Sequence, residues 1–197
     1  MIDFQEIKKQ VQSKLKKGLP AYLTYHNLAH TEDVLQQAII LAHEEGIVSP
    51  DEIFLLKVSA LYHDTGFLSE YNGHEEKSCE IAQTELPKYG LTEKQIDLVC
   101  GMIRATKIPQ NPQNKLEEII CDADLDYLGR NDFYSIGDGL FKEFMHQGIV
   151  SNEYEWNKLQ VGFLQKHVYF TNSCKKKREV LKQQHLEEVK NKVLLVG

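Results

Sequence analysis

Apolar residues recur at intervals of three and four positions along most of this chain. That spacing places them on one face of a helix, where they can be buried against a neighbouring element. The clearest series run over residues 34–42, 96–103, 116–127 and 156–163. No alternating run of apolar and polar residues is bounded by the turn residues of a β-hairpin, so strands are not expected. The pattern predicts an all-α protein of about seven to nine helices.

Helix-capping residues stand directly before these apolar series. Ser49 precedes Pro50, which suits the first position of a helix, and Glu52 completes a capping box. A nearly continuous apolar run follows and predicts a buried helix that ends near His63 and Asp64. Similar helix starts are expected at Thr92, Asn114 and Asn152. The main predicted loops are Gly66–Gly73 and Lys107–Gln113, and a weakly amphipathic helix is expected over residues 173–194.

Composition and charge narrow the class of protein. Hydrophobic residues make up 42% of the 197 residues and charged residues 26%, which is globular rather than disordered or fibrous composition. Lys and Arg total 23 and Asp and Glu total 29, and the resulting net charge of −6 argues against general nucleic-acid binding. A small phosphorylated substrate stays compatible with this charge, because a bound metal ion can reverse the local field.

The start of the chain and its cysteines indicate a cytoplasmic protein. The first residues lack the apolar segment of a signal peptide, and the longest apolar stretch, Ile53–Tyr62, is too short to cross a bilayer. No membrane partner is therefore expected. Buried free thiols in a reducing compartment are expected for the cysteines, because they lack paired spacing: Cys79, Cys100, Cys121 and Cys174.

Histidine and aspartate are concentrated in four short segments, 25–33, 61–67, 73–78 and 121–130. Imidazole and carboxylate ligands together suit a divalent transition metal, and carboxylate-rich sets suit Mg²⁺ or Mn²⁺. The pair His63-Asp64 ends an apolar helix, where a buried carboxylate is costly unless it is paired or coordinated. Taken alone, the pair is compatible with a capping aspartate. The four segments together favour a metal site.

Helix geometry separates the three aspartates of residues 122–126. At about 100° per residue, Asp124 falls in the apolar arc of the predicted helix, whereas Asp122 and Asp126 fall in the polar arc. A carboxylate directed into a core needs a partner, so Asp124 is the favoured metal ligand. Asp122 stays the alternative, because a break in the helix would change the phase. The two aspartates in the polar arc are expected to support a ligand, cap a helix or face solvent.

The order His30, His63-Asp64, Asp124 resembles the H…HD…D signature of the HD-domain metal-dependent phosphohydrolase superfamily, which includes cyclic-nucleotide phosphodiesterases. The segments YHNLAHTEDV, ALYHDTGF, GHEEKS and CDADLDYLGR are similar to successive blocks of small stand-alone HD proteins. In that family the last ligand is the aspartate of an Ala-Asp block, which corresponds to Asp124. The resemblance implies one HD domain over residues 1–197, with its metal-site core at about 22–135 and C-terminal helices 150–197 packed on it.

The resemblance also implies an activity. It points to a metal-dependent phosphohydrolase that acts on a phosphate ester or phosphodiester of a nucleotide or another small molecule. His30, His63, Asp64 and Asp124 would hold a divalent ion, and Mn, Mg, Fe, Zn, Co and Ni are all compatible. Such an ion activates water for attack on phosphorus. Asp64 would orient that water, and His74 would protonate the leaving oxygen.

Other polar residues carry two interpretations each. Lys77 and Arg104 are expected to hold phosphate oxygens, with a salt-bridged surface position as the alternative for both. His26 is expected to face solvent rather than the site, and His167 to be a hydrogen-bonded core residue rather than a pocket residue. The basic run Lys175–Arg178 is expected to be solvated rather than a binding patch. A homodimer is compatible with the sequence.

The chain departs from the pattern of binuclear HD phosphodiesterases. Those proteins use further histidines after the His-Asp pair; His74 matches the first, but Arg104–Lys107 holds none where the next is expected. The resemblance therefore implies one firmly held ion, with a weaker second ion beside Asp64 and His74. No Gly-Tyr-Pro motif indicates cyclic di-GMP hydrolysis. The alternatives are a non-catalytic metal- or nucleotide-binding regulator and, third, a di-iron oxygenase that needs more ligands than are evident.

Overall fold

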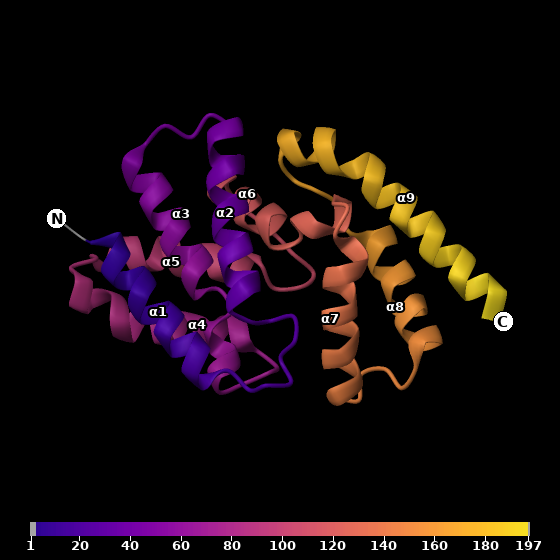
Figure 1. Ribbon diagram of the computed structural model, residues 1–197. Helices are drawn as coiled ribbons and strands as arrows, with labels where there is room; N and C mark the ends of the chain where they lie inside the picture. Colours follow the sequence, from indigo (N-terminus) through magenta and orange to yellow (C-terminus); the bar gives the residue numbers. More distant parts are fainter. Residues whose placement is uncertain (1–2, 197) are drawn as a thin grey trace. The chain divides into compact units, whose positions relative to one another are not determined.

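The computed structural model describes residues 3–196, which form helices and no strand (Figure 1). Nine α-helices and three short 3₁₀ helices follow one another in this described part of the chain. They are α1 (Phe4–Gly18), α2 (Leu28–Glu44), α3 (Pro50–Tyr62), η1 (Thr65–Leu68), α4 (His74–Glu85), η2 (Leu86–Tyr89), α5 (Glu93–Ala105), α6 (Lys115–Asp124), η3 (Asp126–Gly129), α7 (Phe133–His146), α8 (Glu153–Lys166) and α9 (Asn172–Val196). The predicted all-α class is confirmed.

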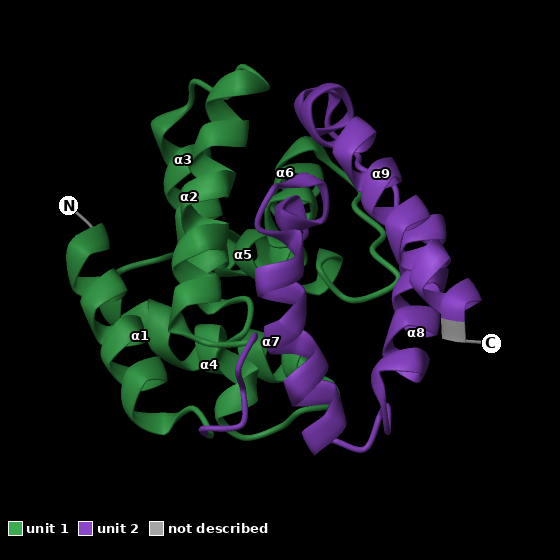
Figure 2. Cartoon of the chain, turned by 45° about the vertical axis from the view of Figure 1, so that its right-hand side comes forward, with its two compact units in different colours: residues 1–20, 26–124 green, residues 21–25, 125–197 purple. Residues whose placement is uncertain are grey.

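The chain divides into two compact units (Figure 2). Unit 1 comprises the residues up to Pro20 together with His26–Asp124, and it contains α1 to α6. Unit 2 comprises Ala21–Tyr25 together with the residues from Leu125 onward, and it contains η3 and α7 to α9. The chain thus leaves unit 1 for a few residues before α2 and leaves it again after α6.

The helices begin where the capping residues predicted them to begin. The Ser49 hydroxyl accepts a hydrogen bond from the Glu52 N–H, with Pro50 in the first turn of α3. Thr92 and Gln95 form the predicted capping box of α5. Each such cap satisfies N–H groups that have no partner inside the helix and typically contributes about 1 kcal/mol. Side chains of Asn114 and Asn152 cap the starts of α6 and α8 in the same way.

Helix α3 forms the centre of unit 1. Its last eight residues are buried almost throughout, and it contacts α2 on one side and α5 on another. Helix α2 also packs against α6. Large apolar side chains that are fully buried each contribute about 1.5–3 kcal/mol, so this packing holds α2, α3 and α6 together. As a result the start of α2 and the ends of α3 and α6 lie together.

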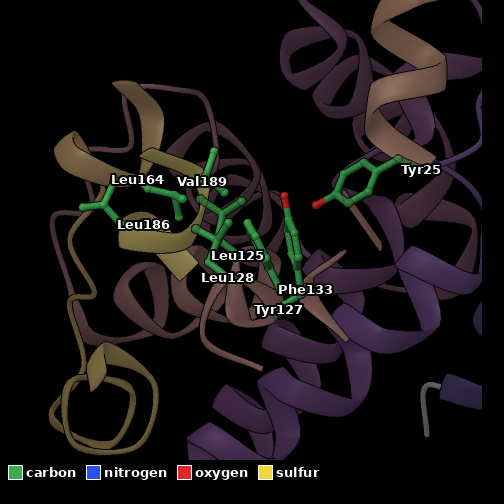
Figure 3. Packing of buried hydrophobic residues seen from close by; sticks show 8 residues of the cluster. All are labelled: Tyr25, Leu125, Tyr127, Leu128, Phe133, Leu164, Leu186 and Val189. Atoms are coloured by element: carbon green, nitrogen blue, oxygen red, sulfur yellow. The ribbon is translucent and has the colours of Figure 1, made fainter. Parts of the chain in front are cut away.

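Unit 2 has its own hydrophobic core, shown in Figure 3. Its buried members are Tyr25, Leu125, Tyr127, Leu128, Phe133, Leu164, Leu186 and Val189. The segment Ala21–Tyr25 is fixed to α7 by polar bonds as well. The Tyr25 N–H donates to Glu143 Oε2 at 3.1 Å, and the Thr24 hydroxyl donates to the Gly139 carbonyl at 2.6 Å. The ring of Tyr22 stacks on that of His146.

Helix α9 buries polar as well as apolar side chains, and this explains the weakly amphipathic pattern of its sequence. Two of its buried side chains are polar, Lys182 and His185. Lys182 Nζ donates to the His167 carbonyl at 2.8 Å, and His185 Nδ1 donates to the Leu128 carbonyl at 2.9 Å. These bonds satisfy polar groups inside the unit, which a hydrophobic pattern does not reveal.

Other expectations are confirmed or corrected at the level of elements. All four cysteines are free and buried, as expected. The predicted loop Gly66–Gly73 is in part helical, because its first residues belong to η1. No helix within residues 3–196 is both long and apolar enough to cross a membrane.

Candidate metal centre

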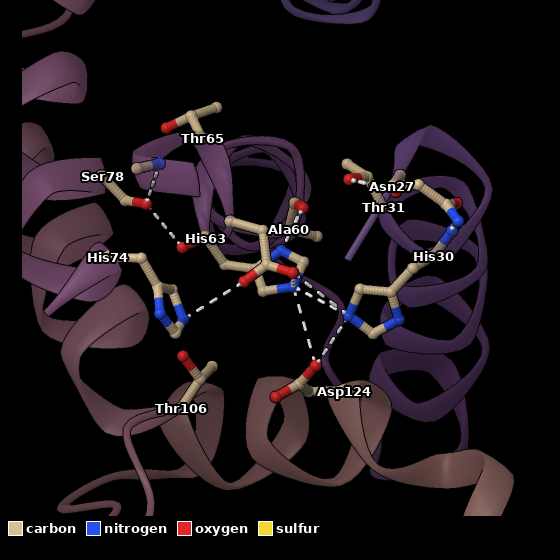
Figure 4. Close-up of polar contacts among 12 residues, drawn as sticks. Asn27, His30, Thr31, Ala60, His63, Thr65, His74, Ser78, Thr106 and Asp124 are labelled. Carbon is tan, nitrogen blue, oxygen red and sulfur yellow. Dashed lines mark hydrogen bonds and ion pairs between the residues drawn. The ribbon is translucent and has the colours of Figure 1, made fainter. Parts of the chain in front are cut away.

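Three helices of unit 1 bring the predicted ligands together. His30 lies in the first turn of α2, whose N-cap residue Asn27 accepts hydrogen bonds from the N–H groups of Ala29 and His30. His63 is the C-cap residue of α3, Asp64 follows it directly, and Asp124 is the last residue of α6. Figure 4 shows the side chains of His30, His63 and Asp124 directed toward one another. Helix termini therefore hold the whole cluster.

The ligand-type atoms of this cluster lie within a few ångströms of one another. His30 Nε2 is 3.3 Å from His63 Nε2 and 3.1 Å from Asp124 Oδ1. Asp64 Oδ2 is 3.4 Å from His30 Nε2 and 3.2 Å from His63 Nε2. The side chains of His63 and Asp64 are 1% and 9% exposed, so water does not separate these groups. The two imidazole nitrogens and an oxygen of Asp124 thus surround one point, and Asp64 Oδ2 contacts both of these nitrogens.

The protonation pattern of the cluster fits a cation. His63 Nδ1 donates to the Ala60 carbonyl at 2.9 Å, because a carbonyl oxygen can only accept. The neutral His63 ring therefore presents a lone pair on Nε2, the tautomer that a metal ligand needs. Asp64 Oδ2 is buried without a hydrogen-bond partner among the described residues. An unsatisfied buried carboxylate oxygen that faces a lone pair calls for a positive charge between them.

Without an ion, protons bind these groups in its place. Burial alone would lower the pKa of His30, but its close contacts with the carboxylates of Asp124 and Asp64 outweigh burial and raise that pKa to about 9. The pKa of His63 is likewise raised, since the neighbouring aspartates outweigh its burial. Burial would raise the pKa of Asp124, but His30 and His63 lower it to about 2. Without an ion, the aspartates therefore favour protonation of the imidazoles, and the imidazoles favour ionised carboxylates.

The two alternative aspartates differ in their contacts with the histidines. Asp124 contacts both histidines, at 3.1 Å and 3.6 Å, and its side chain is 15% exposed. Asp122 is fully buried and is not among the residues grouped around the centre. Helix α6 ends at Asp124, so Asp126 no longer follows its phase. The solvent-facing position allowed for Asp122 and Asp126 is wrong, because both are buried.

His74 stands on the other side of Asp64. Its Nε2 is 3.5 Å from Asp64 Oδ1, and its Nδ1 donates to the Tyr71 carbonyl at 3.2 Å. The backbone of Gly66 passes close to that of His74, which brings the His74 ring near Asp64. Only glycine fits there, because a Cβ atom at position 66 would overlap the His74 carbonyl. Ser78 on α4 completes the link, accepting from the Gly66 N–H and donating to the His63 carbonyl. The close approach at Gly66 and the two hydrogen bonds of Ser78 thus hold the start of α4 against the end of α3.

Three aromatic rings stack beside the centre. The ring of Phe67 stacks on those of His26 and His74, with centroid distances of 4.3 Å and 3.9 Å, and the two imidazole centroids are 6.0 Å apart. His26 is also 6.0 Å, between ring centroids, from His30. The expectation that His26 faces solvent is therefore wrong, since stacking half-buries its ring. One sequence signal could have placed His26 near the centre: it precedes His30 by four residues, close to the start of a predicted helix.

The predicted phosphate-binding cations have acidic partners. Lys77 Nζ is 2.7 Å from Glu80 Oε2, and Arg104 donates to both carboxylate oxygens of Glu76 at 2.6 Å and 3.0 Å. Their role toward a substrate stays a prediction. Thr106 caps the end of α5, near the position where a further histidine was expected; it is buried, and its hydroxyl donates to the Ile103 carbonyl.

The fold and the centre together define a class: an all-α protein in which His30, His63-Asp64 and Asp124 meet at the ends of three helices. The chain belongs to the HD-CE family, which matches residues 19–143 and so includes all four of these residues. It is therefore an HD-domain protein.

One solved structure extends the comparison to nearly the whole chain. It is the crystal structure of a predicted HD superfamily hydrolase from an uncultured Thermotogales bacterium. The TM-score is 0.62 at 19% sequence identity, over 96% of this chain and 92% of that one. A likeness at this identity establishes a shared fold. No curated protein matches the chain.

Proposed function

We propose that this protein is a metal-dependent phosphohydrolase that cleaves a phosphate ester or phosphodiester of a nucleotide or another small molecule. The observation that carries the proposal is the buried, unsatisfied Asp64 Oδ2 that faces the two imidazole nitrogens of His30 and His63. Asp124 supplies a further carboxylate oxygen to the same point. Such a mixed donor set suits Mn, Fe, Co, Ni or Zn, and also Mg when carboxylates dominate.

A divalent ion in this cluster would lower the pKa of water and offset charge on the phosphoryl oxygens. The side chains of the chain supply the remaining chemistry. Asp64 turns Oδ2 toward the two metal-binding histidines and Oδ1 toward His74. The Asp64 carboxylate thereby contacts both the histidines of the cluster and His74. Asp64 is placed to accept a hydrogen bond from the attacking water and to orient it.

His74 is the proposed donor of a proton to the leaving oxygen. The bond from Nδ1 to the Tyr71 carbonyl fixes the ring, so Nε2 is the atom that gains and loses the proton. Stacking on Phe67 keeps the ring in one plane. A histidine suits this task, because an imidazole nitrogen can both accept and donate a proton.

The stack gives a second candidate for this step, His26. Its ring stacks on Phe67, as that of His74 does, and its centroid is 6.0 Å from those of both His74 and His30. The variants His26→Ala and His74→Ala separate the two. The variant that removes the proton donor loses roughly 10²–10⁴-fold in turnover and keeps the metal. That loss shrinks for a nitrophenyl ester, whose leaving oxygen needs less protonation.

The metal content and turnover of each variant identify the role of the histidine that it lacks. If the ion departs together with activity, the substituted histidine is a metal ligand. If turnover barely changes, the histidine is a stacking or capping residue and the proton donor is the other one. Lys77 is the next candidate within unit 1 if neither variant slows the reaction.

Lys77 and Arg104 are proposed to hold the substrate's phosphate oxygens. Each already contacts a glutamate, so a phosphate has to replace that partner. Arg104→Gln is then expected to raise KM more than it lowers kcat, because it removes binding that is equal in the ground and transition states. The proposed partner is thus a small phosphorylated molecule, and neither a membrane nor nucleic acid in general. A homodimer remains part of the proposal.

Metal analysis followed by a phosphate-release screen over nucleotides and sugar phosphates tests the proposal. We expect about one equivalent of a divalent ion in the loaded protein. His63→Ala is expected to abolish tight binding and the rise in melting temperature that a bound ion causes by mass action. Wild-type protein that takes up no divalent ion under any loading condition would disprove the proposal. Metal and nucleotide binding without turnover would instead support the regulator.

A further inference from the structure

Unit 2 contains a cavity whose residues have no role in the proposed reaction. It has a volume of about 200 Å³ and is lined by residues of α7 and α8 and by one residue of α9. All of these lining residues belong to unit 2. Pockets for drug-sized ligands have volumes of roughly 300–1,000 Å³, so this cavity suits a smaller molecule.

Two helices each contribute one complete stripe of residues to this cavity. Positions i, i+3, i+4 and i+7 of a helix share one face. The lining residues of α7 have this spacing: Tyr134, Gly137, Asp138 and Phe141. Those of α8 have it too: Glu153, Trp156, Asn157 and Gln160. Facing stripes of this kind ordinarily carry apolar side chains that pack together. Polar residues and a glycine take many of these positions here, which favours a binding site over a packed helix interface.

Aromatic rings form the apolar part of the lining. Trp156 is 6% exposed, and its ring stacks on that of Phe141 with the centroids 5.8 Å apart. Lys192 of α9 places its ammonium nitrogen 4.3 Å from the centroid of the Tyr134 ring. The face of an aromatic ring attracts a cation. A ring of this cavity therefore already holds an ammonium group, one that belongs to the chain itself.

Two carboxylates in the lining have no cationic partner. Asp138 and Glu153 are exposed, and neither side chain forms an ion pair or a hydrogen bond within residues 3–196. Glu153 begins α8, where the helix dipole also favours an acid. Asp138 lies inside α7, where the dipole gives no such reason and aspartate is a poor helix former. With Lys192 counted, two negative charges face one positive charge, and this excess favours a cation.

A buried amide adds a requirement for a polar ligand. Asn157 is 5% exposed, and Gln160 Nε2 donates to Asn157 Oδ1 at 3.3 Å. This bond leaves the Asn157 N–H groups without an acceptor in the described part of the chain. However the two amides are turned, the bonded pair offers one oxygen and one N–H group to other partners. An apolar ligand would leave both unsatisfied, whereas a ligand with a donor and an oxygen satisfies both.

We propose that this cavity binds a small organic cation, an ammonium or guanidinium group on a short carbon chain that also carries an oxygen acceptor. Asp138 and Glu153 offset the charge of the cation. The rings of Phe141 and Trp156 contact its carbon chain, and the amide pair binds its polar groups. An anion is disfavoured, because it would have to lie beside two carboxylates without partners.

Intrinsic fluorescence tests the site, because Trp156 is the single tryptophan of the chain and lines the cavity. Three ligands of equal chain length differ in charge: aminobutanol in its ammonium form, neutral butanediol and the hydroxybutyrate anion. The full chain is titrated with each ligand at neutral pH and constant ionic strength. We expect a saturable change in tryptophan emission with aminobutanol and none with the other two.

A lysine residue capped at both ends distinguishes two sources of such a cation. Its side chain carries the same ammonium group, and its caps supply carbonyl oxygens. A lower Kd for capped lysine than for aminobutanol would identify the side chain of a partner peptide as the ligand. A higher Kd would identify a free amine.

Two glutamates at the start of α8 supply a matched pair of variants. Glu153→Gln removes a lining charge and is expected to raise the Kd for aminobutanol about threefold to tenfold. Glu155→Gln removes the same charge two residues later, outside the lining, and is expected to change that Kd by less than about twofold. Glutamine keeps an oxygen that can accept from the Ser151 N–H, so this control preserves the start of the helix.

Two further variants separate binding from stability and from charge. In Gly137→Ala the added Cβ would lie 3.7 Å from Gln160 Oε1 and 4.0 Å from Trp156 Cζ2, which are ordinary contact distances. Alanine also favours the helix, so this variant should keep its melting temperature and yet bind aminobutanol more weakly. Lys192→Gln removes a like charge and should lower the Kd for aminobutanol.

Several results would overturn the proposal. Equal responses to butanediol and aminobutanol would show an apolar cavity that does not select charge. Saturable binding of hydroxybutyrate alone would show an anion site. Equal weakening by Glu153→Gln and Glu155→Gln would show a diffuse surface field. If neither aminobutanol nor capped lysine changes the emission in a saturable way, the cavity is only a gap in the packing of α7 against α8.

Discussion

Asp122 and Asp124 are two residues apart on one helix, yet only Asp124 reaches both histidines of the centre. We predict that Asp124→Asn weakens metal binding by more than the roughly 10–100-fold that loss of an outer contact costs. Asp122→Asn is expected to change metal affinity far less, although its burial makes it destabilising. Titration of both variants with the same divalent ion measures the difference. The reverse order of affinities would contradict the assignment of Asp124.

The raised pKa of His30 predicts how the metal-free protein responds to pH. The folded pKa is about 9 and the ordinary value is 6.5. The group therefore stabilises the fold fully below pH 6.5, and this contribution is lost as the pH rises through 9. Denaturant unfolding in chelator should show the free energy of unfolding falling across this range.

Metal should reverse that trend, because an ion competes with protons for the same nitrogens and binds more tightly as the pH rises. The variant His30→Gln serves as the control, since it removes the titrating group. If chelated wild-type protein kept a constant free energy of unfolding from pH 6.5 to 9, the proton-filled cluster would be refuted.

Gly66 offers a prediction about the join between α3 and α4. In Gly66→Ala the new methyl group would overlap the His74 carbonyl, so we expect a loss of about 1–3 kcal/mol in stability. Gly162→Ala is the control, since no atom lies within 4 Å of its added Cβ and the residue is inside α8. That variant should gain up to about 1 kcal/mol from higher helix propensity. Urea unfolding compares the two, and equal effects would contradict the close approach.

At the scale of elements, two asparagine caps separate stability from metal binding. Asn27 caps α2 beside His30, and Asn152 caps α8 in unit 2. Either residue changed to Ala is expected to cost about 0.5–2 kcal/mol of stability, because N–H groups lose an acceptor. Only Asn27→Ala should also weaken metal binding, since it loosens the turn that carries His30. A similar loss of metal affinity in Asn152→Ala would refute this local effect.

The sequence was a sufficient guide to elements whose limits are set locally. Thr92 with Gln95 and Ser49 with Glu52 predicted helix starts correctly, because a cap depends on residues only a few positions apart. The end of α6 was harder to predict. Its apolar spacing continues to Tyr127, yet the helix stops at Asp124 and η3 follows. Periodicity describes which face is buried and does not report where backbone hydrogen bonding changes type.

At the scale of the whole molecule, the four residues predicted to bind metal were chosen from their order along the chain, and their metal binding stays a prediction. Their meeting point depends on how α2, α3 and α6 pack, which single-sequence spacing does not determine. The stacked ring of His26 and the buried pair of Asp126 with Arg178 were missed for the same reason. Each depends on a partner far away in the sequence, and polar residues give no periodic signal of such pairing.

Unit 2 is built from two separate stretches of the chain, Ala21–Tyr25 and the residues from Leu125 onward. This limits how recombination between genes can transfer the unit. A gene fragment that encodes only residues from Leu125 onward lacks a piece of its own unit. It leaves Glu143 and Gly139 without the groups that Tyr25 and Thr24 supply. Recombination at a single breakpoint near Leu125 would therefore transfer unit 2 without Ala21–Tyr25. A working exchange also needs the codons for Ala21–Tyr25, which end two codons before that of Asn27, the cap of the helix that bears His30.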